Sequence, residues 1–329
     1  MKQYKKIRKI EFDLSSNYNS YRSLAYVIED NSLKLNPHVN FDSNITVDII
    51  SKVFDNAFVD DHVEVSMTAT TGDPMTNPNI ISIVEMIYEL KPDANIVLHT
   101  NAGLKSPKVF VQMAEIKSSS GKKPSIWFSI DGLEDTNHFY KDVAWEDVFK
   151  NVVSFTGNSG QGQWIMMEFE INKHQIEEAT ETSQDWGLEK FVLIPDNLDP
   201  EQRAEFDQAF KNKKINETAS NEIIEDDRVK LHAYSPVTAQ CLDGEEIYIN
   251  SDAILVPCSS INSSLMESAR MRETNTFMYK ENNKSWNSLH HNSLFDIMDN
   301  TWWNKLAGTT TSTEQSCTMC VQKCGDWLG

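Results

Sequence analysis

The first 195 residues alternate between short apolar runs and longer amphipathic segments. The apolar runs have the length and β-branched content of strands, and the segments between them place apolar residues at helical spacing. The six strand-like runs are 9–14, 63–69, 95–100, 124–130, 164–171 and 190–195. Strands that alternate with helices pair in parallel, because the chain crosses over a helix before the next strand begins. We therefore predict an α/β fold with a parallel sheet, either an open wound sheet or a full or partial barrel.

Amphipathic patterns connect these strand-like runs. Residues 77–90 repeat apolar side chains at helical spacing, and Pro78 lies near the start, where a helix tolerates proline. Similar patterns cover 107–117, 144–155 and 174–186. We expect these segments to be the helical crossovers between the parallel strands.

The alternation ends near residue 195. A polar, charge-rich stretch follows, and residues 245–258 then have the pattern of a β-hairpin that turns at Ser251 and Asp252. Residues 293–306 predict a helix with an aromatic face, whose Trp302 and Trp303 we expect to pack in a core. The predicted units are a barrel-like domain, a linker and a C-terminal domain, at 1–195, 196–235 and 236–329.

Charge limits the partners of this chain. Its 30 Lys and Arg residues are outnumbered by 49 Asp and Glu residues, which gives a formal net charge of −19. Such a surface repels a phosphate backbone, so we expect no nucleic-acid partner. The basic opening MKQYKKIRKI has no apolar segment after it, and no stretch reaches the length of a membrane span. We therefore expect no membrane association and a reducing, cytoplasmic location.

The cysteines are few and concentrated. All five lie in the last 90 or so residues, at Cys241, Cys258, Cys317, Cys320 and Cys324. An odd number of thiols in a reducing compartment favours metal ligation or redox chemistry over a disulfide framework. The C-terminal C-x2-C-x3-C spacing suits one metal site, with a fourth sulfur available from upstream. Spacing alone leaves structural zinc and an iron–sulfur cluster open, with plain buried thiols as the third interpretation.

The C-terminal pattern resembles a known metal-binding extension. The segment CLDGEEIYINSDAILVPC, followed by the cysteine cluster and Gly325, is similar to the SPASM or twitch domains of radical S-adenosylmethionine (SAM) enzymes. Those domains bind auxiliary [4Fe-4S] clusters, and Ala253 replaces the glycine of their hairpin turn. Five cysteines suffice for one cluster. The resemblance implies a single auxiliary [4Fe-4S] cluster, or zinc as the alternative, held by Cys241, Cys258, Cys317 and one of Cys320 or Cys324. Because C-x2-C is the tighter chelating pair, we expect Cys324 to be the non-ligand.

The N-terminal half resembles the same superfamily. TGDPMTNP (71–78) is similar to the Gly-Gly-Glu-Pro motif that meets the amino group of SAM, with Thr71 for the first glycine and an aspartate for the glutamate. HTNAGL (99–104) resembles the Thr-Asn-Gly turn, and SIDGLEDTNHFY (129–140) resembles the Ser-(Ile/Leu)-Asp-Gly segment. The resemblance implies a (β/α)6 partial, TIM-like barrel with a C-terminal hairpin and helix domain. The cofactor-binding positions it implies are Gly72, Asp73, Asn101, Ser129 and Asp131.

One defining motif of the superfamily is missing. Radical SAM enzymes carry C-x3-C-x2-C in the loop after the first strand, and its three thiolates hold the cluster that reduces SAM. Here the corresponding positions fall on Tyr18, Arg22 and Ala25, and no cysteine precedes Cys241. Phenol, guanidinium and methyl groups do not ligate such a cluster. Because the cofactor performs the chemistry, we predict a degenerate member without radical catalysis, a pseudoenzyme.

Three functions remain open at this point. The first is a non-catalytic barrel with an auxiliary Fe–S or zinc site that binds a peptide, a protein partner or a modified nucleoside. The second is an enzyme, either of the radical SAM/SPASM type or using SAM without radicals, in which Glu168, Glu170 and His174 would supply acid–base groups. Those three more commonly mark a solvated strand end. The third function is a structural role in an assembly. We expect His290 and His291 to be surface residues.

Overall fold

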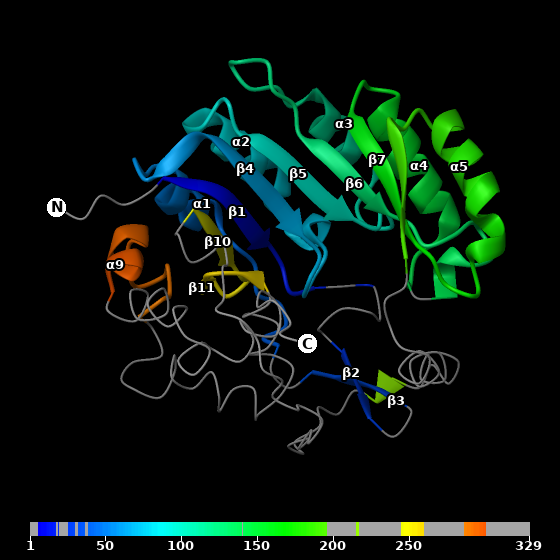
Figure 1. The fold of residues 1–329 in the computed structure, drawn as a ribbon, viewed down its shortest axis with the longest axis horizontal. Coiled ribbons are helices and arrows are strands. Elements are labelled where there is room, and N and C mark those ends of the chain that lie inside the picture. Colours follow the sequence, from blue (N-terminus) through cyan, green and yellow to red (C-terminus); the bar gives the residue numbers. More distant parts are fainter. Residues whose placement is uncertain are drawn as a thin grey trace, which may run out of the picture.

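The computed structural model describes most of the first 195 residues and parts of the rest (Figure 1). The described residues are 6–17, 19, 26–29, 32–36, 39–139, 141–195, 215–216, 245–259 and 286–300. The N-terminal domain predicted from the sequence is therefore almost completely described, whereas four of the five cysteines lie outside the described residues.

The main sheet contains all six predicted strands. They pair in parallel in chain order, as the alternation with helices requires. The strands are β1 (Ile7–Asp13), β4 (Val59–Thr68), β5 (Asn95–Thr100), β6 (Ser125–Ser129), β7 (Gln161–Met167) and β8 (Lys190–Ile194). With two further strands the sheet has eight, in the order β11-β10-β1-β4-β5-β6-β7-β8. This is an α/β fold with a partial TIM-like barrel, as predicted.

Helices cover one face of this sheet (Figure 1). They are α1 (Val47–Phe54), α2 (Ile80–Leu90), α3 (Pro107–Glu115), α4 (Trp145–Thr156) and α5 (Ile176–Asp185). The last four agree with the predicted crossovers. Alternate strand residues are buried against them: Phe128 of β6 has its ring centroid 6.3 Å from that of Phe110 in α3 and 5.8 Å from that of Phe155 in α4.

The helix-covered side of β7 is held by tryptophans. Trp164 is fully buried, and its ring stacks on Trp186 at 5.2 Å and lies 6.5 Å from Trp145 of α4. Its indole N–H donates to the carbonyl oxygen of Ile130 at 2.8 Å, so the polar edge of this buried ring is satisfied. The core therefore fixes the backbone just beyond β6, where the sequence places a candidate site.

The predicted hairpin is present and is joined to the barrel. β10 (Glu246–Ile249) and β11 (Leu255–Val256) pair antiparallel, and β10 also pairs in parallel with β1. Ala253 adopts a left-handed conformation, φ 58°, at the position where the resemblance expects glycine. The Asn250 side chain accepts hydrogen bonds from the backbone N–H groups of Asp252 and Ile254, which supports this turn. The division into a barrel, a linker and a cysteine domain stays a prediction.

A small second sheet was not predicted. β2 (Tyr26–Glu29) and β3 (Ser32–Leu35) form an antiparallel hairpin in the segment after β1, and β9 (Ile215–Asn216) pairs with β3 in parallel. The last described helix, α9 (Leu294–Asp299), begins at the capping box of Ser293 and Asp296. It confirms the start of the helix predicted over 293–306; Trp302 and Trp303 lie outside the described residues.

Two further expectations concern surfaces. His290 and His291 are both exposed, as predicted. In the part of the chain that the structure describes, no helix is both long and apolar enough to span a bilayer.

Candidate functional site

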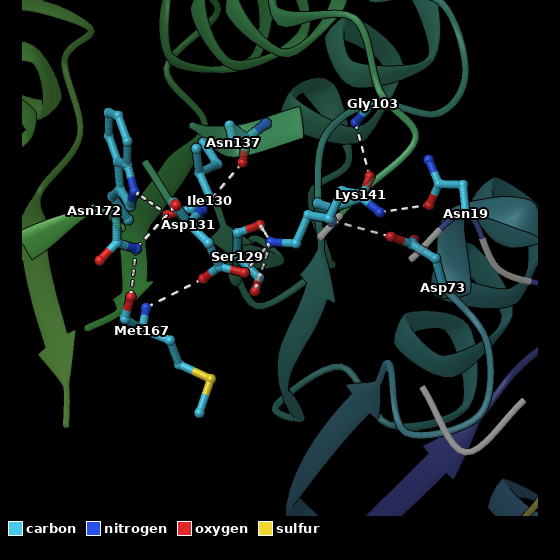
Figure 2. A network of polar contacts seen from close by, with 12 residues as sticks. Asn19, Asp73, Gly103, Ser129, Ile130, Asp131, Asn137, Lys141, Met167 and Asn172 are labelled. Atoms are coloured by element: carbon cyan, nitrogen blue, oxygen red, sulfur yellow. Dashed lines mark hydrogen bonds and ion pairs between the residues drawn. The ribbon is translucent and has the colours of Figure 1, made fainter. Parts of the chain in front are cut away.

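The candidate site is the end of the barrel where the parallel strands finish. The carboxyl ends of β1, β4, β5, β6 and β7 meet at one edge of the sheet, which is where barrels of this type place their functional loops. The sequence motifs TGDP, HTNAGL and SIDG follow β4, β5 and β6 at this edge, so the topology brings them together as expected. Figure 2 shows the polar network that they form.

Asp13 anchors the site at the end of β1. Its carboxylate is fully buried and accepts hydrogen bonds from the backbone N–H groups of Thr70 and Thr71, at 3.1–3.2 Å. The phenol of Tyr248, from β10, donates to the same carboxylate at 2.7 Å. Burial raises the pKa of Asp13 to about 6, although these hydrogen bonds act in the opposite direction. The carboxyl group thus ties three strands together.

Asp73 links the loop after β4 to the end of β5. It is fully buried, and it caps the short 3-10 helix η1 (Pro74–Thr76) by accepting from the Met75 N–H at 2.9 Å. Its other oxygen accepts from the Thr100 hydroxyl at 2.9 Å and from the Asn101 N–H at 3.0 Å. Burial raises the pKa of Asp73 to about 6. Both carboxylate oxygens are therefore occupied by groups of the chain itself.

Gly72 faces the loop that follows β1. A Cβ atom on Gly72 would lie 2.3 Å from the carbonyl oxygen of Ser15 and 2.7 Å from the backbone nitrogen of Asn17, so only glycine fits. The Asn17 carbonyl oxygen accepts from the Asp73 N–H at 3.0 Å and from the Thr76 hydroxyl at 3.1 Å. The space beside Gly72 is thus filled by backbone of the β1 loop.

The β1 loop also contacts the loops after β5 and β6. The Asn101 amide group donates to the side-chain oxygen of Asn19 at 2.5 Å, and the Asn101 side-chain oxygen accepts from the Gly103 N–H at 2.9 Å (Figure 2). The carbonyl oxygen of Asn19 accepts from the Asp142 N–H at 2.8 Å. Hydrogen bonds of a side chain and of the backbone thus hold the described residue Asn19 of this loop.

A buried ion pair occupies the end of β6. The Lys141 ammonium lies 2.8 Å from the Asp131 carboxylate, and the two side chains are only 3% and 5% exposed. The same ammonium donates to the Ser129 carbonyl oxygen at 2.5 Å and to its hydroxyl at 3.4 Å (Figure 2). The second Asp131 oxygen accepts from the Met167 N–H at 3.1 Å. The charges are therefore paired and hydrogen-bonded, as burial requires.

Two asparagines complete the β6 end. Asn137, at the start of the 3-10 helix η2 (Asn137–Phe139), accepts from the Asp131 N–H at 3.1 Å. Its own amide nitrogen is buried without a hydrogen-bond partner. Asn172 precedes the 3-10 helix η3 (Lys173–Gln175) and donates to the carbonyl oxygens of Asp131 and Met167, at 3.0 and 2.8 Å. Within the described network, the Asn137 amide is an open donor.

The structure gathers all five residues that the resemblance assigned to the cofactor. Gly72, Asp73, Asn101, Ser129 and Asp131 all lie at the barrel edge, and each is accounted for by contacts inside the chain. Their role as ligands stays a prediction.

The acid–base candidates beyond β7 are not gathered at this site. Glu170 is exposed and lies 2.6 Å from the Lys173 ammonium, and His174 is also exposed. The half-buried Glu168 continues the pairing of β7 with β8 through its backbone.

Sequence reasoning missed the residues that hold the site together. Asp13, Lys141 and Tyr248 come from segments far apart in the chain, and none has a motif of its own. Asp13 closes a strand, IRKIEFD, that already has three other charged residues, so its charge gave no signal of its own.

The proposed metal ligands are mostly outside the described residues. Cys258 follows β11 and is half-buried, whereas Cys241, Cys317, Cys320 and Cys324 are not described. The positions of the missing radical-cluster ligands, Tyr18, Arg22 and Ala25, are not described either. Among the described residues, no three His, Cys, Asp or Glu side chains come together as a metal site would need.

The fold has matches among solved structures. The partial barrel, a parallel sheet with helices on one face, is similar to the fold of solved radical SAM enzymes. No family model matches the sequence, and no curated protein matches it either.

Two of these matches are the most informative. SuiB of Streptococcus suis is 12% identical with a TM-score of 0.55, over 96% of this chain and 72% of SuiB. The enzyme anSMEcpe with bound S-adenosylmethionine is 9% identical with a TM-score of 0.53, over 97% of this chain and 88% of that one. SuiB has also been solved with its precursor peptide SuiA, and anSMEcpe with the Kp18Cys peptide. Because the sequence identities are so low, these similarities show a shared fold and nothing beyond it.

Proposed function

We propose that this chain is a radical-SAM-fold protein that binds a peptide or protein partner and does not cleave SAM reductively. The observation that carries the proposal is the β1 loop. It lacks every thiolate that would hold the radical cluster, and hydrogen bonds within the chain fasten its described residues Asn17 and Asn19 across the strand ends. The residues present therefore do not fit that cluster, and no reaction step is assigned to it.

The SAM-binding positions are also poorly suited to a ligand. Gly72 faces the backbone of Ser15–Asn17, and the Asp73 carboxylate already accepts three hydrogen bonds. Asp131 is paired with Lys141. A ligand would have to break these buried contacts, and each unsatisfied group left behind costs roughly 1–3 kcal/mol. We therefore expect weak or no binding of SAM.

The cysteines support an auxiliary metal site. Four thiolates are the ligand set of both a [4Fe-4S] cluster and a structural zinc, and the chain has five thiols, all after residue 240. When bound, such a group would supply folding energy to the C-terminal segment rather than chemistry at the barrel.

Two features support a peptide or protein as the partner. The formal net charge of −19 favours a basic partner over a nucleic acid. Two proteins of the same fold have been solved with peptides bound. These likenesses are to the fold alone, so the partner is part of the proposal.

Metal analysis and spectroscopy test this function together. The full chain is purified anaerobically, reconstituted with iron and sulfide, and assayed for iron, sulfide and zinc. We expect about four irons with matching sulfide, or one zinc, and no change in the electron paramagnetic resonance spectrum when SAM is added. Iron beyond one cluster, or a SAM-dependent spectrum, would contradict the proposal.

Single cysteine variants provide matched controls. Cys320→Ser removes one sulfur of the C-x2-C pair and should abolish metal binding. Cys324→Ser changes the expected non-ligand and should retain it. Equal loss in both variants would reassign the ligand set, and no loss in either would remove the auxiliary site from the proposal.

A further inference from the structure

The inner face of the barrel carries a cluster that the polar network at the strand ends does not use. On β5 and β6, Leu98 and Phe128 are fully buried on the side of the helices. Side chains alternate along a strand, so their neighbours His99 and Trp127 point to the opposite face. Both are only partly buried, and they are opposite each other in the strand register.

The geometry joins four residues from four strands. The His99 and Trp127 rings meet edge to face, with centroids 4.8 Å apart. The Nε2 atom of His99 lies 3.4 Å from the Ser66 hydroxyl of β4. Gln163 of β7 is the register partner of Trp127 on its other side. We call Ser66, His99, Trp127 and Gln163 the inner cluster.

Several polar groups of the inner cluster are open. In the part of the chain that the structure describes, neither the Trp127 indole N–H nor the Gln163 amide has a hydrogen-bond partner, and the same holds for Nδ1 of His99. None of these atoms is among the buried groups that lack a partner, so solvent reaches them and a ligand could take the place of that water. Burial lowers the pKa of His99 to about 4, so its ring is neutral at physiological pH and one ring nitrogen can accept a hydrogen bond.

The surroundings of Trp127 itself are uncharged. The neighbouring inner-face positions of β5, β6 and β7 are Val97, Ser125 and Ile165. The charged register positions lie at the two ends of the cluster, with Glu11 beside Ser66 and Lys190 beside Gln163. An aromatic ring packs on the indole face and gains from ring-to-ring contact.

We propose that the inner cluster binds an uncharged aromatic ring that bears a hydroxyl group, as the side chain of tyrosine does. The ring packs on Trp127. Its hydroxyl oxygen accepts from the indole N–H or the Gln163 amide, and its hydroxyl hydrogen is donated to the open nitrogen of His99. The proposal rests on the proposed function in one respect, since it specifies which side chain of a bound peptide the barrel would hold.

Fluorine NMR of the full chain tests this inference. The protein is labelled with 5-fluorotryptophan, which gives a signal for each of its eight tryptophans, and Trp127→Phe identifies the signal of interest. The probes are N-acetyl-tyrosinamide, N-acetyl-phenylalaninamide, and the peptides Lys-Lys-Tyr-Lys-Lys and Lys-Lys-Phe-Lys-Lys. We expect the tyrosine probes to shift the Trp127 signal and to bind about threefold to tenfold more tightly than the phenylalanine probes, the effect of one hydrogen bond.

Variants separate binding from structure. Gln163→Leu keeps the Trp127 signal but removes one donor, so the preference for tyrosine should fall towards one. Trp127→Phe keeps a ring but removes the N–H donor and the signal, so its affinities for the four probes are measured by isothermal titration calorimetry, and the preference should fall there as well. The matched control is Trp145→Phe on the helix side of the sheet, which should leave the preference unchanged. These readouts compare two ligands on one protein, so a general loss of stability would not imitate them.

The NMR experiment and the SAM-cleavage experiment can fail independently of each other. No shift of the Trp127 signal, or equal affinity for tyrosine and phenylalanine probes, overturns the inner-cluster proposal whatever SAM does. Reductive cleavage of SAM would overturn the proposed function and leave this result standing. Tighter binding of the tyrosine peptide than of N-acetyl-tyrosinamide supports a peptide ligand, and equal binding supports a small aromatic molecule in the same cluster.

Discussion

The strand ends and the inner face of this barrel differ in how their polar groups are used. At the strand ends, the carboxylates of Asp13, Asp73 and Asp131 all have partners inside the chain. On the inner face, the side chains of Trp127 and Gln163 make no hydrogen bond within the described residues. The carboxylates at the strand ends thus hold loops together, whereas polar side chains without a partner in the described residues lie on the strands themselves.

The largest expected effect comes from breaking the ion pair at the end of β6. Lys141→Met would leave the Asp131 carboxylate buried without its counter-ion, and we expect a loss of about 3–5 kcal/mol in the free energy of unfolding. Urea titration followed by circular dichroism measures it. The double variant Lys141→Met/Asp131→Asn removes both charges and should recover much of the loss. A loss below about 1 kcal/mol in the single variant would mean that the pair does not hold the strand ends.

The second prediction concerns pH and the buried carboxyl of Asp73. Its pKa of about 6 in the folded chain lies above the ordinary value of 3.8, so the folded state binds the proton more tightly than the unfolded state does. This contribution to stability is fully present below about pH 4 and is lost as pH rises through 6. Relative to Asp73→Asn, the wild type should therefore lose up to about 3 kcal/mol between pH 4 and pH 7. If the difference in unfolding free energy between the wild type and Asp73→Asn did not change with pH, this prediction would be wrong.

The third prediction sharpens the role of Gly72. Gly72→Ala would drive a Cβ atom to 2.3 Å from the Ser15 carbonyl oxygen, and displacing this backbone should cost about 1–3 kcal/mol. Gly187→Ala is the control, because its φ of 75° is strained for alanine but its nearest neighbour, Thr156, would be 3.5 Å away. It should cost about 1 kcal/mol. Gly72 has no positive φ, so a loss in thermal unfolding no larger than that of Gly187→Ala would mean that the contact with the β1 loop does not require glycine.

The smallest expected effect is that of one hydrogen bond. Asn19→Ala removes the acceptor of the Asn101 amide and should cost about 1 kcal/mol. The control is the exposed Asn158, whose side chain donates to the Ser154 carbonyl oxygen, and Asn158→Ala should cost less. The backbone N–H of Asp142 donates to the carbonyl oxygen of Asn19. The hydrogen-exchange rate of this N–H should rise in Asn19→Ala and not in Asn158→Ala. Unchanged exchange would indicate that the β1 loop does not depend on this contact.

The barrel could be predicted because its signals are local. Each parallel strand is a short apolar run, and each crossover repeats at helical spacing, so β4 through β8 and their helices follow from periodicity. The addition of β10 beside β1 could not be predicted, since the two strands are more than 200 residues apart and no local pattern marks their pairing.

The candidate site was predicted only in its motif residues. Asp73 and Asp131 follow their strands within a few residues, so the edge where they meet follows from the topology. The residues that pair with these carboxylates could not be predicted from the topology. Lys141 reaches Asp131 from beyond a 3-10 helix, and Tyr248 reaches Asp13 from β10. His99 and Trp127 face each other across two strands, a contact that depends on register and cannot be read from either strand alone.

The central claim is the proposal that a β1 loop without thiolates does not support reductive cleavage of SAM. The most direct measurement is the formation of 5′-deoxyadenosine by the anaerobically reconstituted full chain, given SAM and dithionite and analysed by mass spectrometry. The account predicts no product above the protein-free background, even when the C-terminal thiols carry a full [4Fe-4S] cluster. Product that increases in proportion to the protein concentration would contradict it.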